Sequence, residues 1–127
     1  MIGIKSSGNT NGIEKLISRA IDKARIINTL NKYGKIGVER LTLATPIDTG
    51  KTALSWEYKV TVNRNGSYNL SWYNTNMTKM NIPVAILIQY GHGTRDGYYI
   101  PGIDYINPAI QPVLQKLSDE LWKEVAK

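Results

Sequence analysis

The feature that most constrains the fold is the apolar pattern between Thr10 and Ala44. Apolar side chains recur there at spacings of three and four residues, at Ile13, Leu16, Ile17, Ala20, Ile21, Ala24, Ile27, Val38 and Leu41. This spacing predicts an amphipathic helix, about 50 Å long if unbroken at roughly 1.5 Å per residue. Gly34 and Gly37 each cost about 1 kcal/mol relative to Ala, so a kink or break is plausible there. Pro46 ends the pattern because it disfavours helical geometry at Thr45.

A β-hairpin is predicted next. Apolar residues alternate with polar ones on both sides of a turn signal: Trp56, Tyr58, Val60 and Val62 before it, and Tyr68, Leu70 and Trp72 after it. Period two with one apolar face is typical of half-buried antiparallel strands. Asn65 and Gly66 are the favoured pair for a primed turn, so we expect them at its two central positions, with residues 56–62 paired to 67–73. Before the hairpin, Asp48 is expected to cap a short helical turn through Leu54.

The remaining segments complete the predicted fold. Residues 84–90 form a nearly continuous apolar run that predicts a strand buried on both faces. Asn107 is expected to cap a C-terminal helix with Pro108 at its first position. We therefore expect one α+β domain over residues 1–127, with residues 1–9 flexible. Its small antiparallel-rich sheet, with the hairpin and a central buried strand, is flanked by a long N-terminal helix and a C-terminal helix.

Composition narrows the class of protein. The chain has no cysteine, which excludes a disulfide framework and a Cys-based zinc site. No apolar run approaches the roughly 20 residues that span a bilayer, and the first residues lack the apolar core of a signal peptide. We therefore expect a soluble, unexported protein made in the cytoplasm, without a membrane partner.

The charge is placed unevenly. The net charge is +6, and residues 1–47 hold eight Lys or Arg against three acidic residues, whereas residues 48–127 hold eight against seven. Lys15, Arg19, Lys23 and Arg25 largely avoid the apolar stripe and give the first helix a basic face. Such a face suits an acidic partner or nucleic acid, and it is equally compatible with a plain solvated surface. No recognition helix, zinc finger or RNP-type motif accompanies it.

The sequence motifs do not favour catalysis. Gly50-Lys51-Thr52 lacks the second glycine of a P-loop, since Thr45 stands there. Gly91-His92-Gly93 has Asp96 where a dinucleotide fingerprint needs its third glycine. His92 is the one histidine of the chain and has no evident metal partner or orienting acid. We expect no enzyme activity, no metal and no cofactor. A hydrolase ranks behind the two non-catalytic functions considered below.

Two loops are instead candidates for contacts between proteins. Residues 74–81 form a polar loop with Met77 and Met80, and residues 91–99 form a glycine-rich loop. Glycine lets the backbone turn sharply and approach a partner closely, and Tyr is enriched at interfaces. The predicted interface residues are Met77, Met80, Gly91, His92, Gly93, Thr94, Arg95, Tyr98 and Tyr99, with Tyr105 as a further candidate.

Several segments in order resemble a family. Ala44-Thr45-Pro46-Ile47-Asp48-Thr49-Gly50, with Ser55 a few residues later, resembles the Pro-x-Asp-Thr-Gly stretch of tail-component proteins of tailed bacteriophages. Tyr90-Gly91-His92-Gly93-Thr94 looks like their Gly-Thr loop, from which it departs by the inserted His92. Asn107-Pro108-Ala109 is similar to the Pro-Ala start of their C-terminal helix. The resemblance extends from about residue 10 to residue 125.

The resemblance implies a structural role. Members of this family are tail-completion or head–tail joining proteins, which form a ring, a hexamer by resemblance, between the tail and the head connector. Implied partners are further copies of the chain, the head connector or stopper and the tail terminator or tail tube, with DNA passing through the channel. The expected location is the virion. The alternative is a small basic nucleic-acid-binding module that uses its N-terminal helix.

Overall fold

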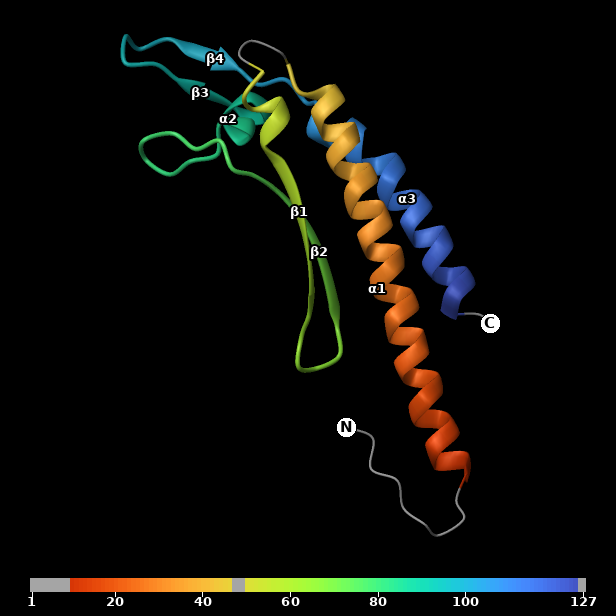
Figure 1. The fold of residues 1–127 in the computed structure, drawn as a ribbon. Helices are drawn as coiled ribbons and strands as arrows, with labels where there is room; N and C mark the ends of the chain where they lie inside the picture. Colours follow the sequence, from red (N-terminus) through yellow and green to blue (C-terminus); the bar gives the residue numbers. More distant parts are fainter. Residues whose placement is uncertain (1–9, 47–49, 126–127) are drawn as a thin grey trace.

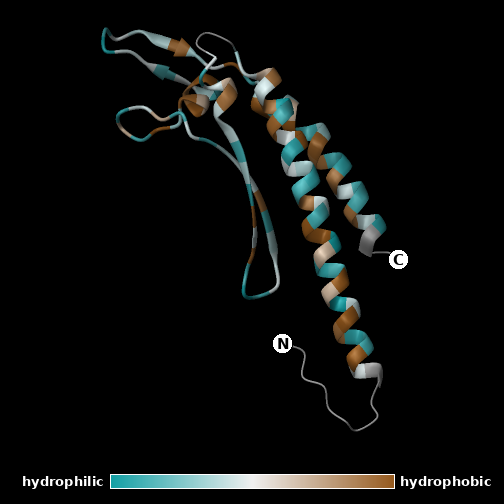
Figure 2. Cartoon of the chain, viewed as in Figure 1, coloured by the Kyte–Doolittle hydropathy of each residue, from teal (hydrophilic) through white to brown (hydrophobic). Residues whose placement is uncertain are grey.

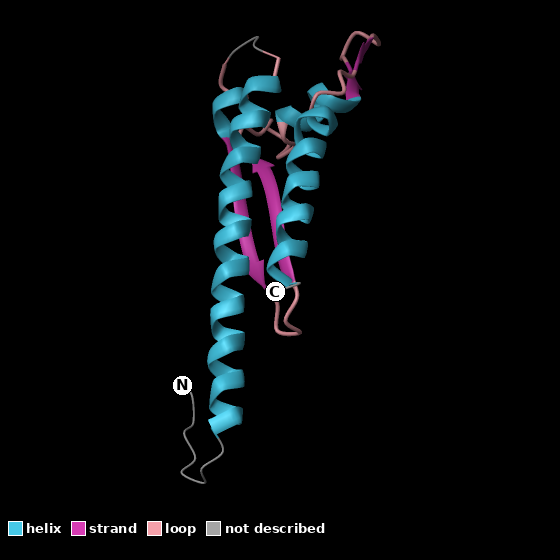
Figure 3. Ribbon diagram, turned by 90° about the vertical axis from the view of Figure 1, so that its right-hand side faces the viewer, coloured by secondary structure: helices cyan, strands magenta, loops and turns pink. Residues whose placement is uncertain are grey.

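The computed structural model describes residues 10–46 and 50–125 and has an α+β fold. The elements are α1 (Thr10–Ala44), the 3₁₀ turn η1 (Ala53–Ser55), β1 (Trp56–Val62), β2 (Tyr68–Asn74), α2 (Val84–Tyr90), β3 (Gly91–Gly93), β4 (Tyr99–Pro101) and α3 (Ile106–Val125). Helices α1 and α3 run antiparallel side by side (Figure 1). The β1–β2 hairpin lies behind the seam between them (Figure 3). The Asp48 cap and the flexibility predicted for residues 1–9 lie outside the described residues.

The first helix is continuous across Gly34 and Gly37, so the kink or break considered there does not divide it. The two glycines allow close packing instead. A Cβ at Gly34 would overlap the ring of Tyr58, and a Cβ at Gly37 would overlap the ring of Trp72. The Trp72 indole Nε1 also donates to the Gly34 carbonyl at 2.9 Å. The missing side chains are therefore what lets the hairpin lie directly on α1.

The hairpin is confirmed, with a different turn. Trp56 pairs with Asn74 and Val62 with Tyr68, one residue from the expected register. The Gly66 amide donates to the Asn63 carbonyl at 3.0 Å and the Asn63 amide to the Ser67 carbonyl at 2.8 Å. Gly66 has φ 85°, while Asn65 is not among the residues with positive φ. Arg64 and Asn65 are thus the central pair, and Gly66 is the left-handed residue of a three-residue loop, so the primed turn was wrong.

We predict that Gly66→Val destabilises the protein by about 1–2 kcal/mol, because a β-branched residue resists positive φ. Nothing lies within 4 Å of a Cβ at this position, so the effect is conformational and not a clash. Gly66→Asn is the control, since Asn tolerates this conformation better. Urea unfolding of both variants measures the difference, and equal losses would contradict this account.

Two apolar clusters form the core between the helices and the hairpin. The first contains Leu41, Trp56, Ala85, Tyr105 and Ile110, and the second contains Leu30, Tyr33, Val113 and Leu117. Trp72 packs against both. The Trp56 indole donates to the Thr45 hydroxyl at 2.8 Å, which satisfies a buried donor at the end of α1. The core therefore ties the C-terminal half of α1 to β1, β2, α2 and α3.

Residues 84–90 form a helix, so the predicted central buried strand was wrong. The described strands make two separate two-stranded sheets, β1–β2 and β3–β4. Pro83 precedes α2 in an extended conformation, and Gly91 ends it with φ 81° while its amide donates to the Leu87 carbonyl. Ala85 and Gln89, four residues apart, are buried, whereas Ile86 is exposed. A short apolar run cannot distinguish strand from helix by periodicity, and here the flanking Pro and Gly indicate the helix.

Gln89 anchors the start of α3. Its side-chain oxygen accepts hydrogen bonds from the amides of Tyr105 at 3.0 Å and Ile106 at 2.9 Å. Its amide nitrogen donates to the Asp104 carboxylate at 2.7 Å. Asn107 lies inside the helix, which begins at Ile106, and its side chain donates to Asp104. The cap predicted at Asn107 is therefore supplied by a glutamine from another helix.

We predict that Gln89→Met destabilises the protein by about 2–3 kcal/mol, because two backbone amides at the helix start lose their acceptor. Gln111→Met is the matched control, since Gln111 lies exposed on α3. Thermal and urea unfolding of both variants give the comparison. If Gln89→Met loses no more stability than Gln111→Met, the capping role is refuted.

Candidate interaction surfaces

The structure brings both candidate loops to one end of the molecule. The segment between β2 and α2 and the β3–β4 hairpin extend in the same direction, away from α1 and α3 (Figure 1). The N-terminal part of α1 lies at the opposite end (Figure 1). The two candidate loops and the predicted basic face therefore lie at opposite ends of the molecule.

The loop with Met77 and Met80 is an ordered turn held by backbone hydrogen bonds. Met77 pairs with Pro83 as an isolated bridge, and the Thr78 amide donates to the Ile82 carbonyl at 2.8 Å. Asn81 adopts φ 60°, the left-handed conformation that closes the turn. Met80 stands at the tip with 81% of its surface exposed. The backbone bonds thus hold a flexible apolar side chain out in solvent, which suits contact with another surface.

The second loop is a short hairpin. His92 pairs with Ile100 and Gly93 with Tyr99. The tip is closed by Gly97 with φ 84° and by a bond from the Thr94 amide to the Tyr98 carbonyl at 2.7 Å. Arg95, Tyr98, Tyr99 and Ile100 are exposed. This hairpin therefore presents a cation, two phenol rings and an aliphatic side chain on one projecting element.

Gly91 has a structural role inside this hairpin. A Cβ there would lie 2.5 Å from the Ile100 carbonyl oxygen and 2.7 Å from the Gly102 amide nitrogen. The residue also has φ 81°, which favours glycine. Its close approach is to its own chain, where it joins α2 to β3.

His92 is half-buried, and its Nδ1 is buried without a hydrogen-bond partner among the described residues. Within residues 10–46 and 50–125, no group of three or more His, Asp or Glu side chains could hold a metal ion.

Tyr105, a further candidate for the interface, is a core residue. It is 5% exposed, and its hydroxyl donates to the Ala85 carbonyl at 2.8 Å. Burial raises its pKa to about 12. Tyr99 differs, since its ring is exposed while its hydroxyl donates to the Tyr90 carbonyl at 2.9 Å. Three nearby tyrosines in the sequence thus divide into two surface residues and one structural residue.

Tyr105 predicts an alkaline loss of stability. Its pKa is raised in the folded protein, so its contribution is complete below the unfolded pKa of about 10 and is lost as pH rises toward 12. Tyr105→Phe should cost about 1 kcal/mol at pH 7 through the lost bond to Ala85. Its stability difference from the native protein should then shrink between pH 10 and 12.

Urea unfolding across that range measures the change. Tyr98→Phe, on the exposed ring, is the control and should show a flat difference. A difference for Tyr105→Phe that stays constant would contradict the assigned role.

The predicted basic face lies on a projecting arm, which we define as residues 12–25 of α1. Lys15, Arg19, Lys23 and Arg25 are all exposed. The first three recur every four residues and share one side, whereas Arg25 is turned about 200° from Lys23. The arm also carries Glu14 and Asp22. It is therefore a moderately basic helix with cations on more than one side.

The arm also exposes an apolar stripe that sequence reasoning did not assign to the surface. Leu16, Ile17 and Ile21 keep 44%, 45% and 47% of their surface exposed. Figure 2 shows apolar residues recurring along this part of α1. The sequence contains a signal that this part of the helix does not pack in the core. Residues 11 apart lie on the same side of a helix. Lys15 and Arg19 stand 11 residues before the packed Ile26 and Leu30, so the core-facing side of α1 becomes basic in the arm.

The C-terminal helix has an apolar surface groove next to its core-facing side. The α3 groove is lined by Leu114, Leu117, Ser118, Leu121 and Trp122. Trp122 keeps 70% of its surface exposed, whereas Leu117 also packs into the core. Asp119 beside it is exposed, and its carboxylate accepts from Gln115 at 3.2 Å. The groove therefore continues the core outward along α3.

The acidic residues Asp119 and Glu120 of α3 differ in their contacts. Glu120 forms an ion pair with Lys32 at 3.3 Å, and its hydrogen bond with Tyr33 lowers the pKa of the carboxyl group. The same bond raises the pKa of Tyr33. Glu120 thus joins α3 to α1 of its own chain. The Glu124 side chain lies outside the described part of the chain.

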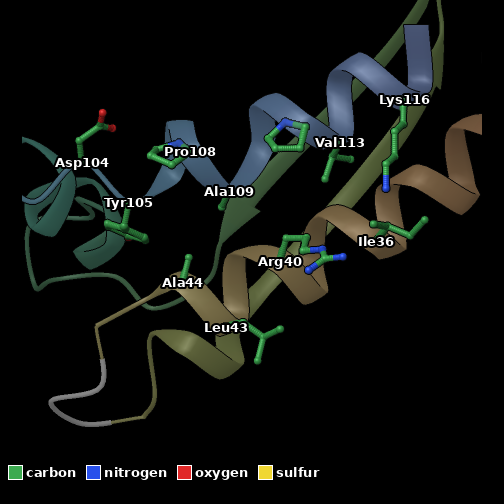
Figure 4. A pocket seen from close by; sticks show the side chains of 11 residues that line it. Ile36, Arg40, Leu43, Ala44, Asp104, Tyr105, Pro108, Ala109, Val113 and Lys116 are labelled. Atoms are coloured by element: carbon green, nitrogen blue, oxygen red, sulfur yellow. The ribbon is translucent and has the colours of Figure 1, made fainter. Parts of the chain in front are cut away.

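A second groove lies between α1 and α3, with a volume of about 580 Å³. Ile36, Ala109 and Val113 contribute apolar surface, and Arg40 and Lys116 extend toward the space between the helices (Figure 4). Among the described residues, Asp104 is the one acid in its lining. The two cations over an apolar floor can accept a segment with apolar and carboxylate side chains.

Comparisons with models of known families, with curated proteins and with solved structures find no match to this chain. Among the described helices, none is both long enough and apolar enough to cross a membrane.

Proposed function

We propose that the chain is a structural subunit of a phage or prophage particle, which forms a ring at the head–tail junction. The proposal is supported most by one observation: elements at both ends of the molecule project from the core and expose large apolar side chains. These are the arm at one end and, at the other, the Met80 turn and the β3–β4 hairpin. Such surfaces are typical of subunits that are completed by neighbours.

A ring needs unlike surfaces on the two sides of each subunit. Head-to-tail contacts close into a ring when their rotation closes, whereas like-with-like contacts stop at a dimer. The basic arm differs in charge from α3, whose described charges at Lys116, Asp119, Glu120 and Lys123 cancel, and the two lie on different elements. The resemblance of the Pro46, Gly91 and Pro108 segments to phage tail-component proteins supports a place between the head connector and the tail, with DNA passing through.

The second candidate function is binding to nucleic acid through the arm. Lys15, Arg19 and Lys23 form an exposed row of cations, which suits phosphate contacts. In that case the isolated protein is a monomer, and its affinity for duplex DNA falls steeply with salt.

A triple charge reversal on the arm tests the first proposal against the second. Lys15, Arg19 and Lys23→Glu should leave the monomer folded, because exposed charges contribute little to folding, and should impair ring assembly. Lys35, Lys59 and Arg64→Glu, also exposed, make the same change in net charge elsewhere. Native mass spectrometry measures the oligomer, and electron microscopy of particles with the labelled subunit locates it.

We expect a closed oligomer and label at the head–tail junction for the native chain and the control triple, and loss of both for the arm triple. A strictly monomeric native protein that binds DNA in a salt-dependent way would support the second function instead. Label elsewhere in the particle would overturn the first.

A further inference from the structure

The arm has no partner within the described part of its own chain. It continues past the end of α3 and past the tip of the β1–β2 hairpin (Figure 1), over about 21 Å at 1.5 Å per residue. Its Ile17 and Ile21 are exposed on a side different from the one that packs in the second half of α1. Leu16 is exposed on the side of Gly34, about five turns further along the helix. A helical segment of this length is marginal in water, where most helix stability comes from a packed apolar face. The stripe is therefore patterned for a surface outside this fold.

The α3 groove likewise exposes apolar side chains that nothing in the described part of the chain covers. The two-stranded hairpin covers the inner side of α3 at Val113 and Leu117 and leaves Leu114 and Trp122 exposed. A groove lined by aliphatic side chains and a Trp is the usual receptor for an amphipathic helix with anchors at i, i+4 and i+8, as Ile13, Ile17 and Ile21 are. Trp is also the side chain most often found at the energetic centre of an interface.

We propose that the arm of one copy docks into the α3 groove of a second copy of this chain. Charge favours this occupant: the arm carries four basic residues against Glu14 and Asp22, whereas the described charges of α3 cancel and its exposed Asp119 lies beside Trp122 at the edge of the groove. Arm-to-arm pairing would instead bring two basic helices together, which costs affinity. The contact joins unlike faces and repeats head to tail, and in this respect it rests on the proposed ring.

The test uses the full chain with one substitution on each side of the contact. Ile17→Asp places a charge in the apolar stripe of the arm, and Trp122→Asp places one in the groove. Each should weaken self-association at least about tenfold and leave circular dichroism unchanged, because both side chains are exposed in the monomer. Ser18→Asp and Lys123→Asp, on exposed neighbouring positions, are the matched controls and should assemble as the native chain does.

Mixing the two variants gives the decisive result. The Trp122→Asp chain keeps an intact arm and the Ile17→Asp chain keeps an intact groove, so their equimolar mixture should form one heterodimer and stop there. Sedimentation velocity and native mass spectrometry resolve this species. A mixture that stays monomeric, a Trp122→Asp chain that assembles normally, or a native chain that is monomeric at every concentration would each overturn the docking.

The docking and the proposed function fail separately. Label at the head–tail junction combined with a monomeric mixture would leave the ring subunit standing and assign the arm to another protein. A heterodimer in the mixture with label elsewhere in the particle would keep the docking and remove the head–tail role.

Discussion

The close approach of the hairpin to α1 is the constraint on which the rest of the structure depends. Gly34 and Gly37 leave room for the rings of Tyr58 and Trp72, and Trp72 in turn touches both core clusters. A two-stranded sheet is marginal by itself in water and needs a helix to cover its apolar face. The cost of the two glycines in helix propensity is offset by this contact. Among the described residues, α1 is thus held by tertiary packing in its C-terminal half, where the hairpin and α3 reach it.

Sequence reasoning predicted the elements whose pattern is long. The 35-residue helix and the alternating strands were predicted with nearly correct bounds, since periodicity over many residues averages out exceptions. The run at 84–90 was mistaken because seven apolar residues fit a buried strand and a buried helix equally well. The hairpin turn was mistaken by one residue, because Asn-Gly also suits a three-residue loop with glycine last.

The Gln89 and Tyr105 contacts lay beyond sequence reasoning for another reason. Both depend on which segments meet in space: Gln89 caps α3 from α2, and Tyr105 bonds to Ala85 across 20 residues. Nothing local marks a glutamine as a cap for a distant helix. Of the candidate interface residues, Met80, Tyr98 and Tyr99 are exposed, whereas Gly91 makes its close contact with its own hairpin.

The apolar stripe of the arm illustrates why a helical pattern alone does not identify a core. The same spacing continues from Ile13 to Leu41, yet its second half is buried and its first half is not. The distinction lies in the basic residues, because Lys15 and Arg19 occupy in the arm the side of α1 that Ile26 and Leu30 pack into the core further along. Along α1 the apolar residues move to another side of the helix, and basic residues occupy the side that they leave. Such a change indicates that the two halves of the helix pack against different surfaces. On this reasoning the second half of α1 builds the fold, and in the docking that we propose its first half extends the same apolar packing to a neighbouring molecule.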